Sequence, residues 1–322
     1  MCISIYQKFL KALKHYNNSK KKLSILIAVS GGQDSLCLVQ LIEKYNIVNQ
    51  YFKDIEYIYI DHQWRCDSKK QIKHLINYIN STKHKISIYQ INYNNMSELL
   101  ARRIRYQILI KHAKNHQQQI ICTGHNKTDY IETFLINLIR GTGLEGLYSI
   151  PLIRKINQQT YLFRPLIDIN RTDVLWFCRK YNLPIWSDKT NFNYKNHRNR
   201  IRHEMLPYLK EYFSPQIEKN ISNFLDLSSL ENEYIKQNAI KMYLISRDKN
   251  YIAMNYKFIK NQHIALQKRV LQIFFYYHFN KFLNKKIVYK IINNINSNHM
   301  SKIVIIWHNL YINIYKNWIY IQ

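Results

Sequence analysis

The sequence lacks closely spaced cysteines. Its five cysteines lie far apart and form no C-x-x-C pair: Cys2, Cys37, Cys66, Cys122 and Cys178. Cysteine-type zinc sites use ligand pairs, and disulfide frameworks use regularly spaced cysteines. The sequence therefore predicts neither a zinc site nor a disulfide framework, and it indicates a protein of a reducing compartment.

Long apolar runs are also missing. No stretch approaches the roughly 20 apolar residues that a transmembrane helix needs. Lys8, Lys11 and Lys14 interrupt the N-terminal stretch, which therefore lacks the apolar core of a signal peptide. We expect a soluble protein with no membrane contact.

Acidic residues are scarce. Asp and Glu total 20 against 48 Lys and Arg, which gives a formal net charge of +28. Such an excess favours a polyanionic partner such as RNA. Composition offers a second explanation, because the chain is also crowded with Asn, Ile and 27 Tyr, residues that an A+T-rich genome favours whatever the function. Both explanations stay open, and the size of the excess favours a nucleic acid partner.

The most informative stretch that is present is a glycine pair behind an apolar strand. Residues 23–29 predict a buried parallel strand, and from Asp34 the apolar spacing becomes helical. The joining segment reads Ser30-Gly31-Gly32-Gln33-Asp34-Ser35. Glycines let the backbone approach a ligand, and the first turn of a helix presents free N–H groups, so the segment is predicted to bind phosphate. Asp34 would repel phosphate unless a cation such as Mg²⁺ lay between them.

This segment differs from the two commonest nucleotide motifs. It fits neither G-x-x-x-x-G-K-[ST] nor G-x-G-x-x-G, so it is not a P-loop or a dinucleotide fingerprint. The alternative is a plain strand-to-helix turn in which glycine serves the turn and Ser or Asp caps the helix. Serines on both sides of the glycine pair favour the phosphate site.

Strands and helices alternate through the first two thirds of the chain. Further strands are expected at residues 55–60, 86–91 and 119–122, and helices at 4–18, 67–80, 97–116 and 126–139. This alternation predicts an α/β fold with a doubly wound parallel sheet and a ligand at the carboxyl ends of the strands. The Gly-Gly segment and Thr123-Gly124-His125 both follow strands and lie at that edge.

Two later segments carry charge suited to chemistry. Asp129 and Glu132 lie one turn apart on the helix at 126–139, on a face beside its buried stripe. Partners for the helix dipole are the alternative for these carboxylates. Residues 196–204, NHRNRIRHE, suit an anion-binding helix start, and a solvated charge run is the alternative.

Taken together, these motifs resemble one family, the tRNA(Ile)-lysidine synthetases, which are N-type ATP pyrophosphatases. The resemblance covers residues 23–210 and rests on eight motifs in the family's order: SGGQDS, DHQWRCDS, ARRIRY, TGHNKTDYIET, RGTGLEGL, FRPL, WSDKTN and HRNRIRHEMLPYL. It implies an adenine nucleotide alpha hydrolase-like fold. It also implies a carbon-nitrogen ligase that joins L-lysine to the wobble cytidine of the CAU anticodon of tRNA(Ile). The cytidine is first adenylated by ATP, and pyrophosphate and then AMP are released. As a result, the tRNA reads the codon AUA in place of AUG.

The resemblance also implies residue roles. ATP, with Mg²⁺ at Asp34, is expected on the loop formed by Ser30, Gly31, Gly32, Gln33, Asp34 and Ser35. Lysine handling or catalysis is expected of His125, Asp129 and Glu132. Arg105 and Arg198 are candidates for contact with the activated base or a phosphate. The chain departs from the family pattern at Thr128, where the family usually has a first of two adjacent aspartates.

The C-terminal third carries no catalytic signal. Helices are expected at 217–243 and 262–282 and a β-hairpin at 301–322, with the aromatic residues serving mainly as core. We expect a catalytic domain at residues 1–212 and a smaller, mostly helical tRNA-binding domain at 213–322. The sequence carries no signal for oligomeric state.

Two other functions are consistent with parts of the sequence. A tRNA thiolase could share the loop, although its chemistry usually needs the paired cysteines that are missing. A noncatalytic RNA-binding protein could retain an old nucleotide fold. We expect the protein in the cytoplasm if its source is bacterial. The plastid stroma is the other expected location, because the composition is typical of an A+T-rich genome.

Overall fold

The computed structural model describes residues 4–16, 22–61, 63, 68–91, 97–148, 150–186, 194, 196–297 and 302–322. The chain divides into two compact units, Met1–Asn223 and Phe224–Gln322. In the described part, no helix is both long and apolar enough to cross a membrane.

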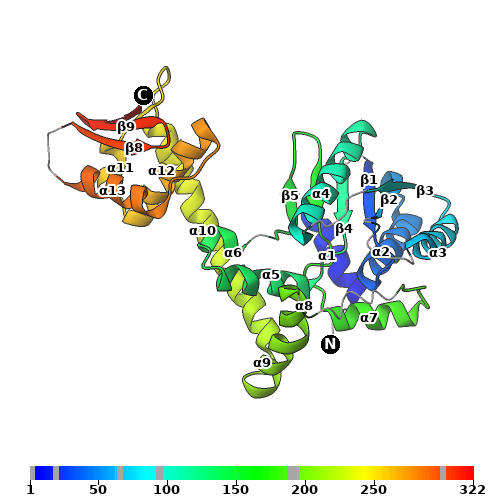
Figure 1. The fold of residues 1–322 in the computed structure, drawn as a ribbon. Helices are drawn as coiled ribbons and strands as arrows, with labels where there is room; N and C mark the ends of the chain where they lie inside the picture. The colour runs from blue at the N-terminus through cyan, green and yellow to red at the C-terminus, as the bar shows by residue number, and fades with distance from the viewer. Residues whose placement is uncertain are drawn as a thin grey trace. The chain divides into compact units, whose positions relative to one another are not determined.

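The first unit is built on a six-stranded sheet with the strand order β3-β2-β1-β4-β6-β5 (Figure 1). All neighbouring strands run parallel except the edge pair of β5 and β6. The strands are β1 (Leu23–Val29), β2 (Phe52–Asp61), β3 (Lys85–Gln90), β4 (Ile120–Thr123), β5 (Ile153–Lys155) and β6 (Tyr161–Phe163). The helices are α1 (Ile5–Tyr16), α2 (Gln33–Asn49), α3 (Ser68–Asn80), α4 (Glu98–Asn115), α5 (Lys127–Ile139), α6 (Leu144–Leu147), α7 (Arg171–Lys180), α8 (His197–Arg200), the π-turn η2 (Ile201–Met205) and α9 (Leu206–Tyr212).

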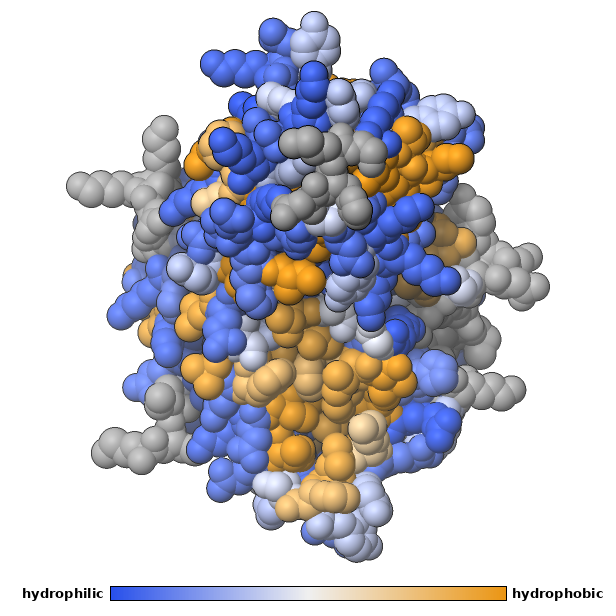
Figure 2. Space-filling model, turned by 90° about the vertical axis from the view of Figure 1, so that its left-hand side faces the viewer, coloured by the Kyte–Doolittle hydropathy of each residue, from blue (hydrophilic) through white to orange (hydrophobic). Residues whose placement is uncertain are grey.

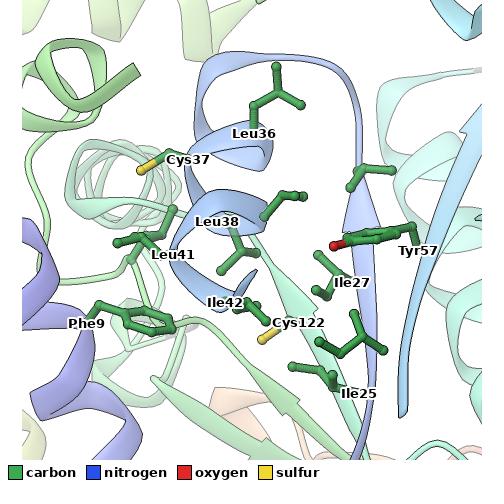
Figure 3. Packing of buried hydrophobic residues seen from close by; sticks show 14 of the residues in the cluster. Phe9, Ile25, Ile27, Leu36, Cys37, Leu38, Leu41, Ile42, Tyr57 and Cys122 are labelled. Carbon is green, nitrogen blue, oxygen red and sulfur yellow. The ribbon is translucent and has the colours of Figure 1, made fainter. Parts of the chain in front are cut away.

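Helices cover both faces of this sheet. One core contains Ile25 and Ile27 of β1 with Phe9 of α1 and Leu38 of α2 (Figure 3). The other contains the alternate residue Leu26 together with Leu109 of α4. Burial on both faces explains why β1 is a continuous apolar run, as expected of a central parallel strand.

The chain reverses its direction of winding beside β1. It proceeds outward from β1 to β2 and β3, then returns to place β4 on the other side of β1. In open α/β sheets, a ligand crevice forms where two neighbouring strands lead to opposite sides in this way. The crevice is therefore expected at the carboxyl ends of β1 and β4, which lead into the Gly-Gly turn and into residues 124–126.

The long helix α10 (Ile217–Ser246) begins in the first unit and ends in the second. The second unit adds α11 (Lys257–Lys260), α12 (Ile264–Phe279) and α13 (Lys285–Asn296) to an antiparallel sheet of order β7-β10-β9-β8. Its strands are β7 (Ala253–Asn255), β8 (Ile303–Trp307), β9 (Leu310–Tyr315) and β10 (Trp318–Ile321). The core includes Phe274, Phe275 and Trp307.

The predicted doubly wound α/β fold is confirmed, as is a mostly helical C-terminal region that ends in a β-hairpin. Strand β10 extends the hairpin, and α13 is a helix that the sequence analysis did not predict. Phe274 and Phe275 are core as expected, whereas Tyr276 and Tyr277 are exposed. The boundary between the compact units lies inside α10, whereas we expected a domain boundary before it. The assignment of functions to the two domains stays a prediction.

Candidate active site

The Gly-Gly turn is held by hydrogen bonds of its own and by its neighbours. Gly31 has φ +75°, a left-handed conformation that favours glycine. The Ser35 hydroxyl donates to the carbonyl of Gly32, at 2.9 Å. From outside the turn, Gln71 Nε2 donates to the Ser30 carbonyl at 2.7 Å, and the Trp186 N–H donates to the Gly31 carbonyl at 3.0 Å. The turn is therefore fixed at the start of α2, where helix N–H groups face an incoming anion.

A second glycine lets the end of β4 approach the same helix start. A Cβ at Gly124 would lie 3.0 Å from the backbone carbonyl carbon and oxygen of Asp34. A side chain there would push β4 and α2 apart. The residues after β4 thus lie directly beside the predicted phosphate loop.

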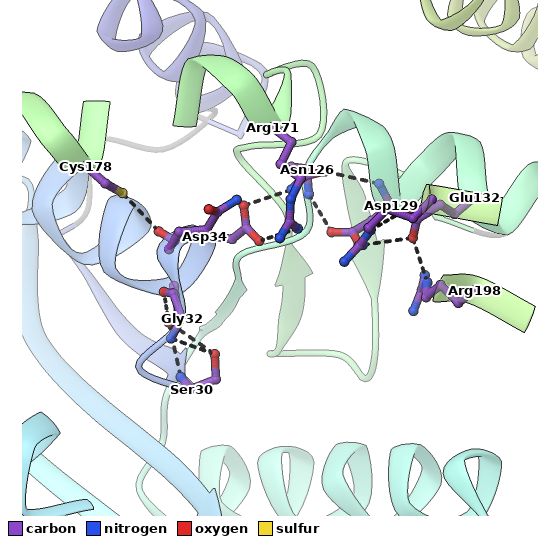
Figure 4. Close-up of polar contacts among 12 residues, drawn as sticks. Ser30, Gly32, Asp34, Asn126, Asp129, Glu132, Arg171, Cys178 and Arg198 are labelled. Atoms are coloured by element: carbon purple, nitrogen blue, oxygen red, sulfur yellow. Dashed lines mark hydrogen bonds and ion pairs between the residues drawn. The ribbon is translucent and has the colours of Figure 1, made fainter. Parts of the chain in front are cut away.

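Asp34, on the first turn of α2, faces the residues that follow β4. Its Oδ1 accepts from Asn126 Nδ2 at 2.8 Å, and its Oδ2 lies 3.5 Å from a guanidinium nitrogen of Arg171 (Figure 4). Burial and the nearby carboxylate of Asp129 raise the pKa of Asp34, while Arg171 opposes this shift. The carboxylate therefore lies where an additional positive charge would be stabilised.

Asn126 joins Asp34 to Asp129. It is fully buried and is the N-cap of α5: its side chain accepts from the Asp129 N–H, and its own N–H donates to Asp129 Oδ2, both at 3.1 Å. This reciprocal arrangement is a capping box. Asp129 therefore acts as a partner of the helix start, which was the alternative prediction for this carboxylate, and it also faces the site.

Glu132 is paired with two arginines. Its carboxylate is completely buried, and it accepts from Arg198 Nε at 3.0 Å and from Arg202 Nε at 2.5 Å. Arg202 also donates to Asp129 Oδ1 at 3.0 Å. Burial raises the pKa of Glu132, and the two guanidinium groups oppose that shift. For Asp129, burial is outweighed by Arg198, His125 and Arg202, and its pKa is lowered.

Both arginines come from one short helical segment packed against α5. Arg198 lies in α8 and Arg202 in the π-turn η2 that continues it. Arg198 NH2 also donates to the hydroxyl of Thr133, at 2.9 Å. A π-turn inserts an extra residue into a helix and often occurs at functional sites. The segment predicted to bind anions therefore presents its guanidinium groups to the carboxylates of α5.

His125 lies between these carboxylates and a second group of arginines. Burial lowers the pKa of His125 to about 3, with Asp129 opposing the shift and Arg164, Arg102 and Arg105 adding to it. His125 Nδ1 lies 2.9 Å from the Thr123 hydroxyl. The imidazole is therefore neutral at pH 7 and adds no positive charge beside Asp129.

The structure brings most of the predicted site residues into one connected network. Hydrogen bonds and ion pairs run from Asp34 through Asn126 to Asp129, and through Arg202 to Glu132 and Arg198. His125 precedes Asn126, and Arg105 of α4 is close enough to influence His125 electrostatically. The roles expected of these residues stay predictions.

Sequence reasoning missed Asn126, Arg171 and Arg202. Arg202 and Asn126 lie inside quoted motifs but received no role, because nothing in the sequence shows which side of a basic run faces α5. Arg171 begins α7, which returns to the start of α2: Cys178 Sγ donates to the Gln33 carbonyl at 3.4 Å. A helix N-cap signal could have identified Asn126, since Asp129 follows it by three residues.

Two of the sequence motifs lie partly outside the residues that the structure describes. In DHQWRCDS the residues outside are 62 and 64–67, and in WSDKTN they are residues 187–191. Thr128, the departure from the family pattern, is 6% exposed near the start of α5.

The cysteines of the described part are poorly suited to sulfur chemistry. Cys37, Cys122 and Cys178 are free and buried. A hydrogen bond with Cys178 and burial raise the pKa of Cys37, and burial raises the pKa of Cys122. A thiol with a raised pKa is a poor nucleophile at neutral pH.

An apolar pocket of about 340 Å³ lies farther along α5. It is formed by α5, α8 and η2 and is lined by Ile136, Ile139, Arg140, His197, Arg200, Ile201, Glu204 and Met205. Most of its exposed surface is apolar, and none of its lining residues belongs to the Gly-Gly turn. Figure 2 shows one face of the molecule, on which hydrophilic residues surround an apolar patch.

Comparisons with known proteins agree on one family. A PP-loop domain model matches residues 5–209. The chain is 63% identical to a chloroplastic tRNA(Ile)-lysidine synthase of Gracilaria tenuistipitata var. liui, over 99% of this chain and 98% of that protein. It is 34% identical to a tRNA(Ile)-lysidine synthase of a Nostoc species, over 80% of this chain and 79% of that protein.

A solved structure supports the fold. The U34-tRNA thiolase NcsA of Methanococcus maripaludis, determined with its [4Fe-4S] cluster, matches with a TM-score of 0.59 at 17% identity. The match covers 69% of this chain and 77% of that one. At this identity, the likeness establishes the architecture alone.

Proposed function

We propose that this chain uses ATP to join free L-lysine to the wobble cytidine of the CAU anticodon of tRNA(Ile). The chain belongs to the tRNA(Ile)-lysidine synthase family of PP-loop proteins. The product is lysidine, and the tRNA then reads AUA in place of AUG. The observation that carries the proposal is the network in which Asn126 connects Asp34, beside the phosphate loop, to the carboxylates and arginines of α5, α8 and η2.

In the first step, the cytosine carbonyl oxygen attacks the α-phosphorus of ATP and pyrophosphate leaves. The Gly-Gly turn and the first N–H groups of α2 would hold phosphate oxygens. Mg²⁺ fits here, because it usually binds one or two carboxylates together with substrate phosphates, and Asp34 offers a carboxylate whose raised pKa reflects burial and a like charge nearby. When bound, Mg²⁺ would neutralise charge on the triphosphate.

Arginines of the network would then change partners. Arg171, Arg198 and Arg202 pair with Asp34, Glu132 and Asp129, so three guanidinium groups offset three carboxylates. A triphosphate offers these cations a stronger partner, since bidentate arginine contacts suit phosphate. When the arginines bind phosphate, the carboxylates lose these partners, and their oxygens can bind the ammonium group of lysine.

In the second step, the ε-amine of lysine attacks the carbon that bears the adenylate. The carbon-oxygen bond breaks, AMP leaves, and a proton is lost from the amine. Asp129 would hold the ammonium group before the reaction, and Glu132, whose pKa is raised by burial, would take up the proton. The neutral imidazole of His125 adds no positive charge that would repel the ammonium group. Arg105 would stabilise negative charge on the adenylate phosphate.

The decisive test is ATP-dependent incorporation of labelled lysine into tRNA with a CAU anticodon. The expected result is one lysine per tRNA and one AMP per lysine, with none incorporated when the wobble C is replaced by U. Sulfur transfer to the tRNA without lysine would support a thiolase. Tight tRNA binding with no covalent change would support a noncatalytic RNA-binding protein.

For tRNA binding, we propose residues 213–322, as expected from the sequence. The stretch from residue 249 to 322 contains no Asp or Glu and 11 Lys and Arg. In α13, Val288 and Ile291 are buried whereas Lys285, Lys286 and Lys290 are exposed, so the charged side chains that this helix presents are all basic. Phosphate contacts supply sequence-independent affinity, and the site beside Asp34 would select the base.

Replacing Lys285, Lys286 and Lys290 together with glutamine should flatten the salt dependence of tRNA binding. Each lost phosphate contact reduces the slope of log affinity against log salt by about one unit. The ratio of the tRNA affinity at 50 mM salt to that at 200 mM salt should fall by about 60-fold if all three lysines contact phosphate. The measurement is tRNA titration at several salt concentrations.

The matched control removes the same charge from the first unit. Lys69, Lys70 and Lys73 are exposed on α3, and their triple glutamine variant should keep a slope near that of the wild type. Equal slopes for both triple variants would contradict a role for α13 and would favour compositional drift as the origin of its charge.

We also propose a plastid location, which the chloroplastic members among the relatives support. The first unit carries the predicted catalytic residues in the range 30–198, so the expected catalytic domain at residues 1–212 is retained as part of the proposal.

A further inference from the structure

A second cluster of ligand-type side chains lies at the other edge of the sheet. Glu56 is in the first half of β2, opposite the first residue of β3, and His112 and His116 are at the end of α4. The amino ends of β2 and β3 form this edge, whereas Asp34 follows the carboxyl end of β1. One candidate ligand atom from each of the three residues lies within 4.8 Å of the others. The cluster is therefore separate from the proposed active site.

His112 and Glu56 lie within ion-pair distance of each other. His112 Nε2 lies 3.0 Å from Glu56 Oε1, yet this buried nitrogen has no aligned partner among the described residues. The other ring nitrogen, Nδ1, lies 2.9 Å from the hydroxyl of Tyr89. Tyr89 thus orients the ring and leaves Nε2 beside the carboxylate oxygen. A metal ion that replaced the proton between these two atoms would be bound by both of them.

His116 completes a helical ligand pair. It follows His112 by four residues, a spacing that places two side chains on one helix face. The two rings are stacked with centroids 4.1 Å apart, and His116 is exposed. Tetrahedral zinc has bonds of about 2.0 to 2.2 Å to nitrogen and oxygen, which places its ligand atoms roughly 3.3 Å apart. Rotation of the exposed His116 ring can supply the small remaining movement.

A buried amide points to the same place. Gln118 is 2% exposed, and its Nε2 donates to Asp54 Oδ2 and Glu56 Oε2, both at 3.2 Å. Its Oε1 is buried and has no hydrogen-bond partner among the described residues. An unpartnered buried oxygen costs about 1 to 3 kcal/mol, so it needs an explanation. A water held by a cation would satisfy it.

The space next to these groups is large enough for a hydrated ion. A pocket of about 400 Å³ is lined by Asp54, Glu56, Lys85, Ile86, Ser87, His116 and Gln118. The Ser87 hydroxyl donates to Glu56 Oε1 at 2.7 Å, which orients the carboxylate from its second side. Two carboxylates and one ammonium group line the pocket, so it suits a cation although the chain as a whole is strongly basic.

We propose that Glu56, His112 and His116 bind one divalent transition metal ion of the zinc type, with water in the fourth position. Two imidazoles and one carboxylate are ligands that zinc accepts, and Tyr89 and Gln118 act as the outer partners that orient such ligands. The ion would tie the end of α4 to β2. This site is independent of the proposed ligase activity.

The test is zinc binding by the untagged full-length chain. We expect one zinc per chain after desalting and an increase of several degrees in the thermal midpoint when zinc is added. His116→Ala should weaken the zinc Kd by about 100-fold or more and abolish the thermal shift, and Tyr89→Phe should weaken it by about 10-fold. Because His116 is exposed, its replacement should leave the fold intact. Lysidine formation should survive it.

Two controls make the outcome decisive. His15→Ala removes an exposed histidine of α1 and should bind zinc as the wild type does. Asp34→Asn should also retain the zinc. Less than a tenth of an equivalent in the wild type, equal losses in His15→Ala and His116→Ala, or loss only in Asp34→Asn would each overturn the proposal.

Discussion

Asp34→Ala is expected to lower lysine-independent pyrophosphate release by about 10²- to 10³-fold, the range seen when one group that stabilises transition-state charge is removed. Asp34 is the carboxylate at the start of α2, and it faces Asn126 and Arg171. Its removal would leave the triphosphate without the proposed cation site. The measurement is release of labelled pyrophosphate in single-turnover reactions.

Folding should not account for this loss. Burial and Asp129 raise the pKa of Asp34, so its charge is held unfavourably and its removal should cost little stability. Asp34→Asn is the companion variant, because it keeps the shape and a hydrogen-bond acceptor for Asn126 while removing the charge. Pyrophosphate release near the wild-type rate in both variants would contradict a role for the carboxylate.

Asp129→Asn is expected to abolish lysine transfer while keeping pyrophosphate release within about tenfold. Asp129 lies at the start of α5 and pairs with Arg202. A helix-dipole partner alone contributes only about 0.3 to 1 kcal/mol of stability. Because Asp129 is also buried against Arg202, its replacement should cost more than that, and thermal unfolding must show that the variant is still folded. An asparagine oxygen can still accept the N–H of Asn126, so the cap should persist. The measurement is incorporation of labelled lysine, with thermal unfolding followed in parallel.

The matched control uses the same helix position elsewhere. Asp173 is the third residue of α7 after its N-cap Asn170, as Asp129 is the third of α5 after Asn126. Asp173 pairs with Lys8 and is partly exposed. Asp173→Asn removes the same charge from the same position and should leave lysine transfer unchanged. If the two variants lost activity and stability alike, both aspartates would be helix partners only.

The sequence was sufficient to predict the sheet because its signals are local. β1 is buried on both faces, and its apolar run shows this without knowledge of its neighbours. The strand-to-helix turn is equally local, because Gly31 has the positive φ that a glycine at a tight turn allows. The return of β4 to the side of β1 followed from the alternation of strands and helices.

The partners of the site carboxylates could not be predicted in the same way. Glu132 takes both Arg198 and Arg202 from a segment more than sixty residues away in sequence. A π-turn helps to place them, and no pattern of apolar residues announces such a turn. Their pairing depends on how α8 and η2 pack on α5, which is a tertiary property.

The zinc-type cluster escaped notice for a different reason. The spacing of the cysteines excludes zinc sites with cysteine ligands only, and it says nothing about histidine and glutamate ligands. Glu56 lies in a strand, with His112 and His116 in a helix more than fifty residues later. Only the packing of α4 against the sheet, where Leu109 and Ala113 share a core with Ile58 of β2, brings them together.

The most direct test of the account is to trap the intermediate between its two steps. tRNA with a CAU anticodon, ATP labelled at the α-phosphate, and the Asp129→Asn variant are mixed without and with lysine. The account predicts that label accumulates on the tRNA in the variant and persists after lysine is added, whereas the wild type releases it as AMP when lysine arrives. Label that never appears on the tRNA in either protein, while lysine is still incorporated, would contradict an adenylated cytidine and with it the proposed division of roles between Asp34 and Asp129.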